Sequence, residues 1–405
     1  MTMTKRMRLF LTLFLGMMSA MAPLSTDMYL PALPEFTTDF GISASLAQLT
    51  LTMTMIGMAT GQMIMGPLSD RYGRRPPLLA GMVVFAVTAA GCAIVRDIHV
   101  FLVLRFLMGF AGAAGIVIAR AIARDVAEGV ELTRFFAILM MVNGLAPILA
   151  PVIGGQVLLL SDWRGIFVLL IIVGLVQTGA TIVYRETLPV ERRIADLGAS
   201  FQKFPALLHD QYFLGHCLTQ CFVFGAFFSY LAGSTFLFQN IYHVTPQVFS
   251  LIFGGIGVGL LVCGIVPARL AGRVPDVELL MGSIAIPVIG SAALLAGFLL
   301  DAPIGYTLPV LFVTIVPLSV MGAASFSLAL SRQGKNAGSA SALIGFAQMI
   351  LGGLMMPLVG IAGGASAIPM GVLMLAGYTL GGITFLTLIY PDHRRGGKIM
   401  MAQRR

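Results

Sequence analysis

The chain has 405 residues, of which 58% are hydrophobic and 10% are charged, and its formal net charge is +8. A soluble domain carries about a quarter charged residues, so this composition excludes a soluble globular protein and indicates a membrane protein with several spans. A nucleic-acid-binding protein would also be basic. Here, however, the basic residues stand in short segments between long apolar stretches, which argues against that class.

Each apolar stretch is long enough for one membrane-crossing helix, and the chain accommodates about a dozen of them. We expect spans at approximately 9–33, 44–66, 77–95, 99–119, 135–160, 164–184, 212–238, 247–268, 278–300, 304–330, 337–362 and 367–390. If the N-terminus starts inside, every basic residue falls on the cytoplasmic side except Arg96, Arg105 and Arg164. This bias follows the positive-inside rule and predicts that both termini are cytoplasmic.

The first span imitates a cleavable signal peptide, because a basic start and an apolar run precede Ala20-Met21-Ala22. Cleavage there would leave an odd number of spans and reverse the charge bias of every later loop. We therefore expect a retained first helix.

The longest connection, at about 185–211, divides the chain near its middle. Residues 264–273 repeat the pattern of 66–75, with the leading glycine and two arginines kept and Ala268 in place of the acid. A degenerate second copy is typical of a duplicated membrane protein. We predict an all-α membrane protein of twelve transmembrane helices in two pseudo-symmetric six-helix bundles. The bundles are expected at 1–190 and 212–405, with a cytoplasmic linker at 191–211 between them.

Asp27 is an acid deep in the first span, after a long apolar run and before Pro31. Burial disfavours the charged form of a carboxylate, so such a residue can hold a proton in one conformation and release it in another. The alternative is that Asp27 only caps backbone groups near Pro31. We favour the proton-handling interpretation.

The segment 66–75 joins two apolar spans with one acid, three arginines and two glycines. Such a charge density is not stable in hydrocarbon, so this segment must lie at a membrane surface, where we expect a tight turn. Its candidate functional residues are Gly66, Asp70, Arg71, Gly73, Arg74 and Arg75.

Arg105 is the one basic residue deep within a predicted span. An unpaired guanidinium there would be costly, so it needs a partner or a wet cavity. It can pair with Asp27, bind backbone carbonyls or orient water beside that carboxylate. A purely structural role is the remaining alternative.

The fifth span places glycines and prolines at three- and four-residue steps. Because proline removes a backbone hydrogen bond and glycine permits close approach, we expect this helix to be kinked and tightly packed on one face. Ordinary helix packing is the alternative. The residues concerned are Gly144, Pro147, Pro151, Gly154 and Gly155.

Aromatic and uncharged polar residues in other spans suggest the wall of a cavity, although each is more often a packing residue. We select Asn143, Phe224, Phe228, Tyr230, Phe346 and Gln348 as candidate substrate contacts, together with Asp27 and Tyr29. The sequence contains no phosphate-binding loop, so we expect no nucleotide cofactor and a gradient as the energy source. Cys217 and Cys221 alone make a poor metal site, and we expect no metal.

The segments 24–34, 66–75, 146–155, 185–193 and 338–342 resemble signatures of the major facilitator superfamily and of its bicyclomycin/chloramphenicol-resistance drug:proton antiporters. This resemblance implies the major facilitator fold, a bacterial inner-membrane location, and efflux of small amphipathic drugs in exchange for protons by alternating access. It implies that Asp27 handles protons and substrate with Arg105 as its partner. It also implies that Asp70 and Arg71 latch the cytoplasmic side near the start of the eleventh helix. A monomer in the lipid bilayer is expected.

Three functional classes stay open. The first is a proton-coupled exporter, and the second is a transporter of a natural metabolite such as a nucleoside or an amino acid. The third is a non-transporting receptor, which would need an extramembrane domain for which the sequence offers no segment. Some drug antiporters carry a second first-helix acid where this chain has Ser19 and Ala20.

Overall fold

The computed structural model describes residues 5–127, 129–193, 204–270, 273–331, 333 and 337–391. Within these residues every regular element is helical. The chain forms two compact units, Met1–Gly198 with Val244–Gly254, and Ala199–His243 with Gly255–Arg405. Residues 194–203 of the predicted linker lie outside the described part of the chain.

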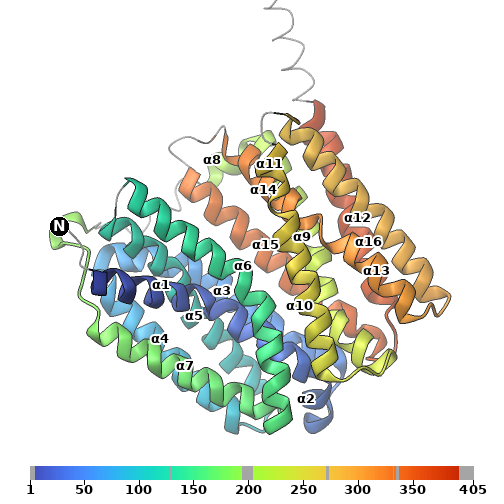
Figure 1. Cartoon of the computed structure of the whole chain (residues 1–405), viewed down its shortest axis with the longest axis horizontal. Coiled ribbons are helices and arrows are strands. Elements are labelled where there is room, and N and C mark those ends of the chain that lie inside the picture. Colours follow the sequence, from blue (N-terminus) through green and yellow to red (C-terminus); the bar gives the residue numbers. More distant parts are fainter. Residues whose placement is uncertain are drawn as a thin grey trace, which may run out of the picture. The chain divides into compact units, whose positions relative to one another are not determined.

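The first unit contains the helices drawn from blue to light green in Figure 1. Asp97 and Asp162 begin two of them, because their carboxylates accept hydrogen bonds from the first N–H groups of α5 and α7. The elements are α1 (Lys5–Thr26), η1 (Asp27–Ala32), α2 (Leu33–Phe40), α3 (Ala44–Tyr72), α4 (Arg75–Ile94), α5 (Ile98–Val126), α6 (Gly129–Leu160) and α7 (Trp163–Val183).

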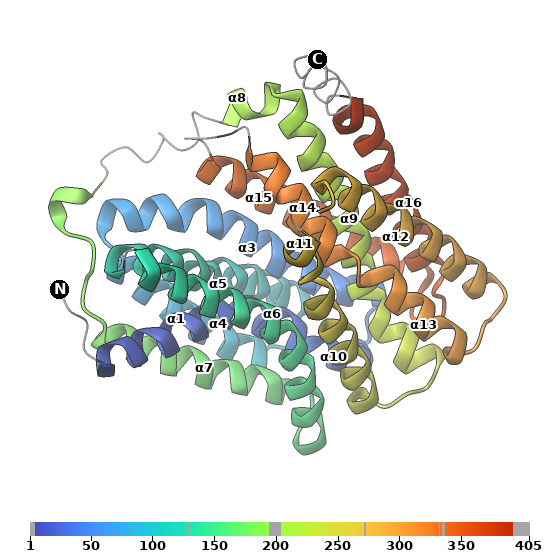
Figure 2. The same ribbon diagram turned by 45° about the horizontal axis from the view of Figure 1, so that its top comes forward.

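The second unit is arranged around α9, which packs against α14, α15 and α16. Figure 2 shows the same helices turned toward the viewer. Its elements are α8 (Phe204–His209), α9 (Gln211–Phe236), η4 (Leu237–Ile241), α10 (Pro246–Cys263), α11 (Val266–Leu270), α12 (Asp276–Leu299), α13 (Ile304–Ile315), α14 (Leu318–Ser331), α15 (Ala337–Val359), η6 (Gly360–Ala362), α16 (Ile368–Thr384) and η7 (Phe385–Ile389). The first part of α10, through Gly254, groups with the first unit.

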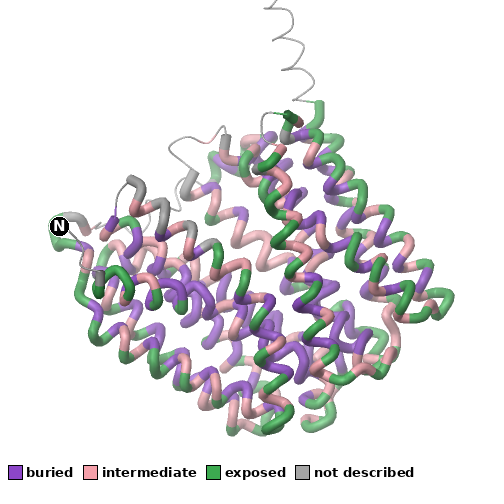
Figure 3. Tube along the Cα trace, in the orientation of Figure 1, coloured by how far each residue is buried: buried purple, intermediate pink, exposed green. Residues whose placement is uncertain are grey.

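Eleven helical stretches of the described residues are long and apolar enough to cross a membrane. The expected span at 44–66 is also helical, as the 29-residue α3, but its threonines and glutamines lower its mean hydropathy below that of the other spans. With α3, the helices match all twelve expected positions. Large apolar side chains such as Val87, Leu160 and Ile289 are exposed, as required of surfaces that contact lipid. Exposed and half-buried residues recur along the helices in Figure 3.

Two expected boundaries need correction. The first span does not end near residue 33, because α2 carries the helical path on to Phe40. The segment 66–75 is not a ten-residue turn: α3 continues to Tyr72, and α4 begins at Arg75. The span expected at 304–330 is confirmed as one apolar stretch, Ile304–Leu330, within which α13 and α14 meet at Pro317, a residue that cannot donate a backbone hydrogen bond.

Candidate functional site

The α-helix α1 ends at Thr26. The six residues that follow, Asp27–Ala32, form a 3-10 helix instead of continuing the α-helix. Pro31 provides the local reason, because its ring would clash with the carbonyl of Asp27 in an α-helix and it has no N–H to donate. The acid therefore stands where the regular helix is interrupted.

Asp27 is 8% exposed, and the hydroxyl of Thr26 donates to its Oδ1 at 2.9 Å. No backbone N–H of a described residue donates to this carboxylate, so the capping role considered for Asp27 is not what its contacts show. Shielding from water is unfavourable for the charged form of a carboxylate, whereas the hydrogen bond from one hydroxyl is favourable for it.

Arg105 lies on α5 and is fully buried. Its Nη1 donates to the carbonyl oxygen of Ser25 at 2.8 Å, and its Nε lies 3.5 Å from the carbonyl oxygen of Thr50. Its guanidinium also stands 5.0 Å from the ring centroid of Tyr29 and 5.6 Å from that of Phe167. Cation–π contacts and carbonyl dipoles thus stabilise its charge.

The ion pairs among the described residues do not include Asp27 with Arg105. Of the arrangements that the sequence left open, the structure has the one in which Arg105 binds backbone carbonyls. One of those carbonyls belongs to Ser25, two residues before Asp27. Arg105 therefore fixes the end of α1 from which Asp27 projects.

Tyr29 is fully buried in an aromatic cluster of the first unit. Its ring lies 5.5 Å from Phe36 and 5.5 Å from Phe167, and Trp163 stands 5.0 Å from Phe36. The indole N–H of Trp163 donates to Asp39 at 3.0 Å. The cluster supports the guanidinium of Arg105 from one side.

Glycines let the backbones around this site approach closely. A Cβ on Gly57 of α3 would lie 2.1 Å from the carbonyl oxygen of Phe106, and one on Gly109 of α5 would lie 2.1 Å from that of Thr54. This close contact between α3 and α5 brings Arg105 within reach of Thr50.

Gly154 makes a similar contact between α6 and η1. A Cβ there would lie 2.0 Å from the carbonyl oxygen of Met28, beside Asp27. The carbonyl of its neighbour Gly155 accepts a hydrogen bond from Gln247 at 3.0 Å. Pro147 and Pro151 lie within α6, which is continuous from Gly129 to Leu160. The expected tight packing thus involves the segment that bears Asp27.

A second polar site surrounds the α3–α4 turn, where Gly73 has φ +94°. Arg74 is 6% exposed; it donates to Asp70 and to the hydroxyl of Ser69, and its Nε donates to Asp125 of α5 at 2.7 Å. The buried arginine thus ties the two ends of the turn to α5. Asp70 pairs with Arg74 within its own unit.

Glu186, which follows α7, completes this turn. It accepts the backbone N–H groups of Arg74 at 2.9 Å and Arg75 at 3.0 Å. Partial burial raises the pKa of the Glu186 carboxyl, but the N–H groups of Leu188, Arg75, Arg74 and Thr187 outweigh burial and hold this pKa below its usual value. A Cβ on Gly73 would lie 2.5 Å from this carboxylate, so glycine is required there for space as well as for φ.

Sequence reasoning missed Asp125 and Glu186. Both stand among basic residues at the ends of spans. An acid within a positively charged segment is the sequence feature that could have identified them as functional residues. Arg71, in contrast, lies outside the network, because it is exposed and stands 5.4 Å from the ring of Tyr72. Gly66 joins the network through its backbone, whose carbonyl accepts a hydrogen bond from the Ser69 hydroxyl at 2.9 Å.

The expected cavity residues of the second unit gather partly at the contact between α9 and α15. Gln348 donates from Nε2 to Oε1 of Gln220 at 2.5 Å, and Phe224 stands 6.3 Å from Phe228. Phe228 and Tyr230 are buried, whereas the remaining candidates are half-buried, namely Phe224, Phe346 and Gln348, as is Asn143 on α6 of the first unit.

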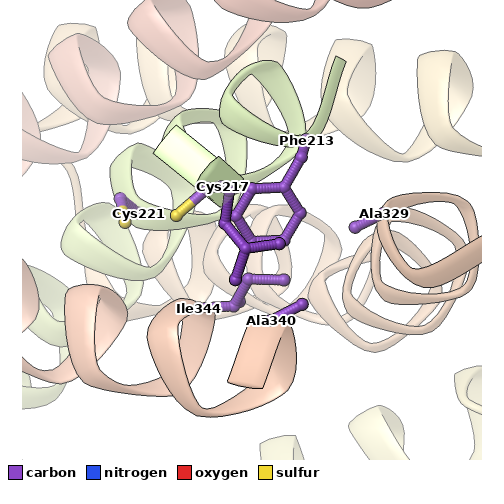
Figure 4. Close-up of a cluster of buried hydrophobic side chains, with 7 residues drawn as sticks. Phe213, Cys217, Cys221, Ala329, Ala340 and Ile344 are labelled. Atoms are coloured by element: carbon purple, nitrogen blue, oxygen red, sulfur yellow. The ribbon is translucent and has the colours of Figure 1, made fainter. Parts of the chain in front are cut away.

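The two cysteines of α9 lie in an apolar cluster. Cys217 and Cys221 pack with Phe213, Ala329 and Ile344 (Figure 4). Among the described residues, no group of three or more histidines, cysteines or acids is arranged to hold a metal ion. A cavity of about 280 Å³ lies elsewhere in the second unit, lined by residues that include Tyr242, Phe298 and Asp301.

The Major Facilitator Superfamily model matches residues 10–357. The chain belongs to this superfamily. Its members are transporters rather than enzymes, so this chain is a multi-pass transporter. The superfamily and the major facilitator fold that the sequence predicted are therefore confirmed.

Relatives agree with that assignment over two thirds or more of their length. The chain is 39% identical over 389 residues to the uncharacterized MFS-type transporter YdgK of Bacillus subtilis, covering 95% of this chain and 96% of the relative. It is 31% identical to a bicyclomycin resistance protein homolog of Haemophilus influenzae, covering 86% and 88%. It is 32% identical to a chloramphenicol resistance protein of Pseudomonas aeruginosa, covering 72% and 67%.

Solved structures share the fold. The nucleoside transporter NupG aligns with a TM-score of 0.75 at 13% identity, covering 93% of this chain and 99% of NupG. The xylose transporter XylE from E. coli aligns with a TM-score of 0.70 at 15% identity, covering 94% and 98%. At this identity the likeness concerns the superfamily fold alone.

Proposed function

We propose that this transporter exports small amphipathic drugs, of the bicyclomycin or amphenicol type, in exchange for protons by alternating access. The observation that carries the proposal is Asp27, a buried carboxylate at the interruption of α1 with a hydroxyl as its donor. Relatives named for bicyclomycin and chloramphenicol resistance support the class of cargo.

Asp27 is the proposed proton carrier. While the carboxyl is shielded from water it favours the neutral form, and access of water to it stabilises the anion and releases the proton. The Thr26 hydroxyl can donate a hydrogen bond to the anionic form of Asp27. When Asp27 is neutral, the same hydroxyl can donate to the carbonyl oxygen of Ala22, which already lies 3.0 Å away. Both protonation states of Asp27 are thus accommodated.

Arg105 is the proposed partner of Asp27. It acts through the backbone, because its bond to the Ser25 carbonyl holds the end of α1 in place. The contact of Gly154 with Met28 then links movement of α6 to the segment that bears Asp27.

The proposed substrate contacts combine aromatic rings with neutral polar groups, which suits ligands that are apolar over most of their surface. Tyr29 is fully buried, and in the present conformation its ring contacts the guanidinium of Arg105. The set is Asp27, Tyr29, Asn143, Phe224, Phe228, Tyr230, Phe346 and Gln348.

The polar α3–α4 turn is the proposed cytoplasmic latch, formed by Gly66, Asp70, Arg71, Gly73, Arg74 and Arg75. This assigns both termini to the cytoplasm, in agreement with the distribution of basic residues. We place the protein in the bacterial inner membrane as a monomer.

The test is a substrate panel in proteoliposomes with a pH-sensitive dye. It includes chloramphenicol, bicyclomycin, nucleosides and amino acids, with Asp27→Asn as the matched control. We expect neutral amphipathic drugs to move against protons in the wild type and to give no proton movement in the control. Proton-coupled movement of nucleosides or amino acids alone would assign the metabolite class instead.

A further inference from the structure

Gln220 is a buried amide in the middle of α9, 1% exposed. Its Oε1 accepts the hydrogen bond from Gln348 on α15 at 2.5 Å. Its own Nε2 is buried and has no acceptor among the described residues. An amide nitrogen carries two N–H donors, so this side chain keeps unused hydrogen-bonding capacity inside the bundle.

An unpaired donor in a buried position is unfavourable, because the N–H groups have lost water without gaining an acceptor. The two amides can also turn together by half a rotation. Their mutual hydrogen bond is then kept with its direction reversed, and Gln220 presents an acceptor in place of the donor. The Gln220–Gln348 pair can therefore meet either the N–H or the carbonyl of a ligand amide.

The surroundings of the pair are neutral. Neither α9 nor α15 contains an aspartate, glutamate, lysine or arginine. His216, one turn away on α9, has its Nδ1 3.1 Å from the hydroxyl of Ser325. A charged ligand group would find no opposite charge on these two helices, so the pair suits uncharged polar groups.

An aromatic surface adjoins the pair. Phe224 lies one helical turn from Gln220 and is half-buried, and Phe228 lies one turn further. A Cβ on Gly352 would come within 2.0 Å of the Phe228 ring, so that ring is pressed against the backbone of α15. Phe224 is half-buried and lies 6.3 Å from both Phe227 and Phe228, so it belongs to an aromatic group that adjoins the amide pair.

We propose that Gln220 and Gln348 are the specificity-determining residues for neutral cargo that carries both an amide and an aromatic ring. In the reversed arrangement of the pair, Oε1 of Gln220 accepts the N–H of the ligand amide, which an ester lacks, and Phe224 packs on the ring. This inference rests on the proposed drug export and names the cargo more narrowly.

The test measures binding of radiolabelled chloramphenicol to the purified protein, alongside an analogue in which an ester replaces the amide. Gln220→Leu should weaken binding of the amide about tenfold and leave binding of the ester unchanged, as expected for one lost hydrogen bond. Gln348→Leu changes a half-buried residue and should give the same pattern if Gln220→Leu fails to fold.

The matched control is Gln177→Leu. Gln177 on α7 is also 1% exposed with an unpaired Nε2, but it belongs to the first unit. The Gln177→Leu variant should bind the amide and the ester as tightly as the wild type does. Equal weakening of amide and ester by Gln220→Leu, or no weakening of either, overturns this inference. If wild-type protein shows neither binding nor proton-coupled movement of any drug, the proposed function itself fails.

Discussion

The first unit buries charged residues, among them Asp27 and Arg105, whereas the α9–α15 contact of the second unit holds a pair of neutral amides. Arg105 is fully buried and bound to the carbonyls of Ser25 and Thr50. Gln220 and Gln348 instead bond to each other. A buried charged residue that is bonded to backbone carbonyls cannot be replaced without loss of those hydrogen bonds. A pair of amides can instead rearrange its hydrogen bonds around a ligand.

This difference separates two tasks. We interpret the first unit as the part that handles protons, because its acid and its arginine are held in defined positions beside an interrupted helix. We interpret the second unit as the part that recognises cargo, because its polar groups are uncharged and adjoin aromatic rings. The predictions below test this division.

The largest effect is expected for Asp27→Asn. The amide cannot take up and release a proton, so substrate-induced proton release from the purified protein should be abolished. Folding should be intact, because asparagine keeps the acceptor for Thr26. The measurement is the pH change on addition of drug to protein in a weakly buffered detergent solution. Undiminished proton release by the folded variant would show that Asp27 is not the coupling residue.

Arg105→Lys distinguishes a backbone anchor from a simple positive charge. Lysine keeps the charge but loses the planar group that bonds two carbonyls and stacks between Tyr29 and Phe167. We expect drug export in proteoliposomes to fall about tenfold, which corresponds to about 1.4 kcal/mol. Transport at the wild-type rate would mean that only the charge matters.

Gly154→Ala tests the contact between α6 and the segment beside Asp27. The added Cβ would lie 2.0 Å from the Met28 carbonyl oxygen, so the helices must separate. Overpacking of this kind costs about 1–3 kcal/mol and should lower the thermal unfolding midpoint. Gly179→Ala on α7 is the control, because its Cβ would meet nothing within 4 Å. Equal midpoints for the two variants would rule out a tight contact.

Glu186→Gln should give the smallest effect, because solvent screens the exposed carboxylate. The pKa of Glu186 is depressed in the folded protein, so its stabilisation is present above the usual carboxyl pKa and is lost as the pH falls through the folded value. The wild type should exceed the variant by about 1 kcal/mol near pH 7, and this difference should shrink as the pH falls below the usual glutamate pKa. Unfolding midpoints measured across this range check the sign. A difference that grows in acid would contradict it.

The sequence predicted the helical spans and the burial of Asp27, because hydropathy and proline placement act locally. Pro31 even marks the interruption of α1. The partner of Arg105 was not predictable, because it depends on how closely α5 approaches α1 and α3. Asp125, Glu186 and Gln220 were missed for the same reason: each acquires its role from a helix distant in sequence.

The most direct test of the account is the dependence of export on membrane potential in proteoliposomes held without a pH gradient. One proton exchanged for a neutral drug moves one net charge, so 100 mV supplies about 2.3 kcal/mol, or roughly a fiftyfold drug gradient. With Asp27 as the one proton carrier, export of a neutral amphenicol should follow an imposed potassium diffusion potential. Export of a monovalent cationic drug should not respond. An equal response of both drugs would contradict the one-proton account and require a second proton-binding group.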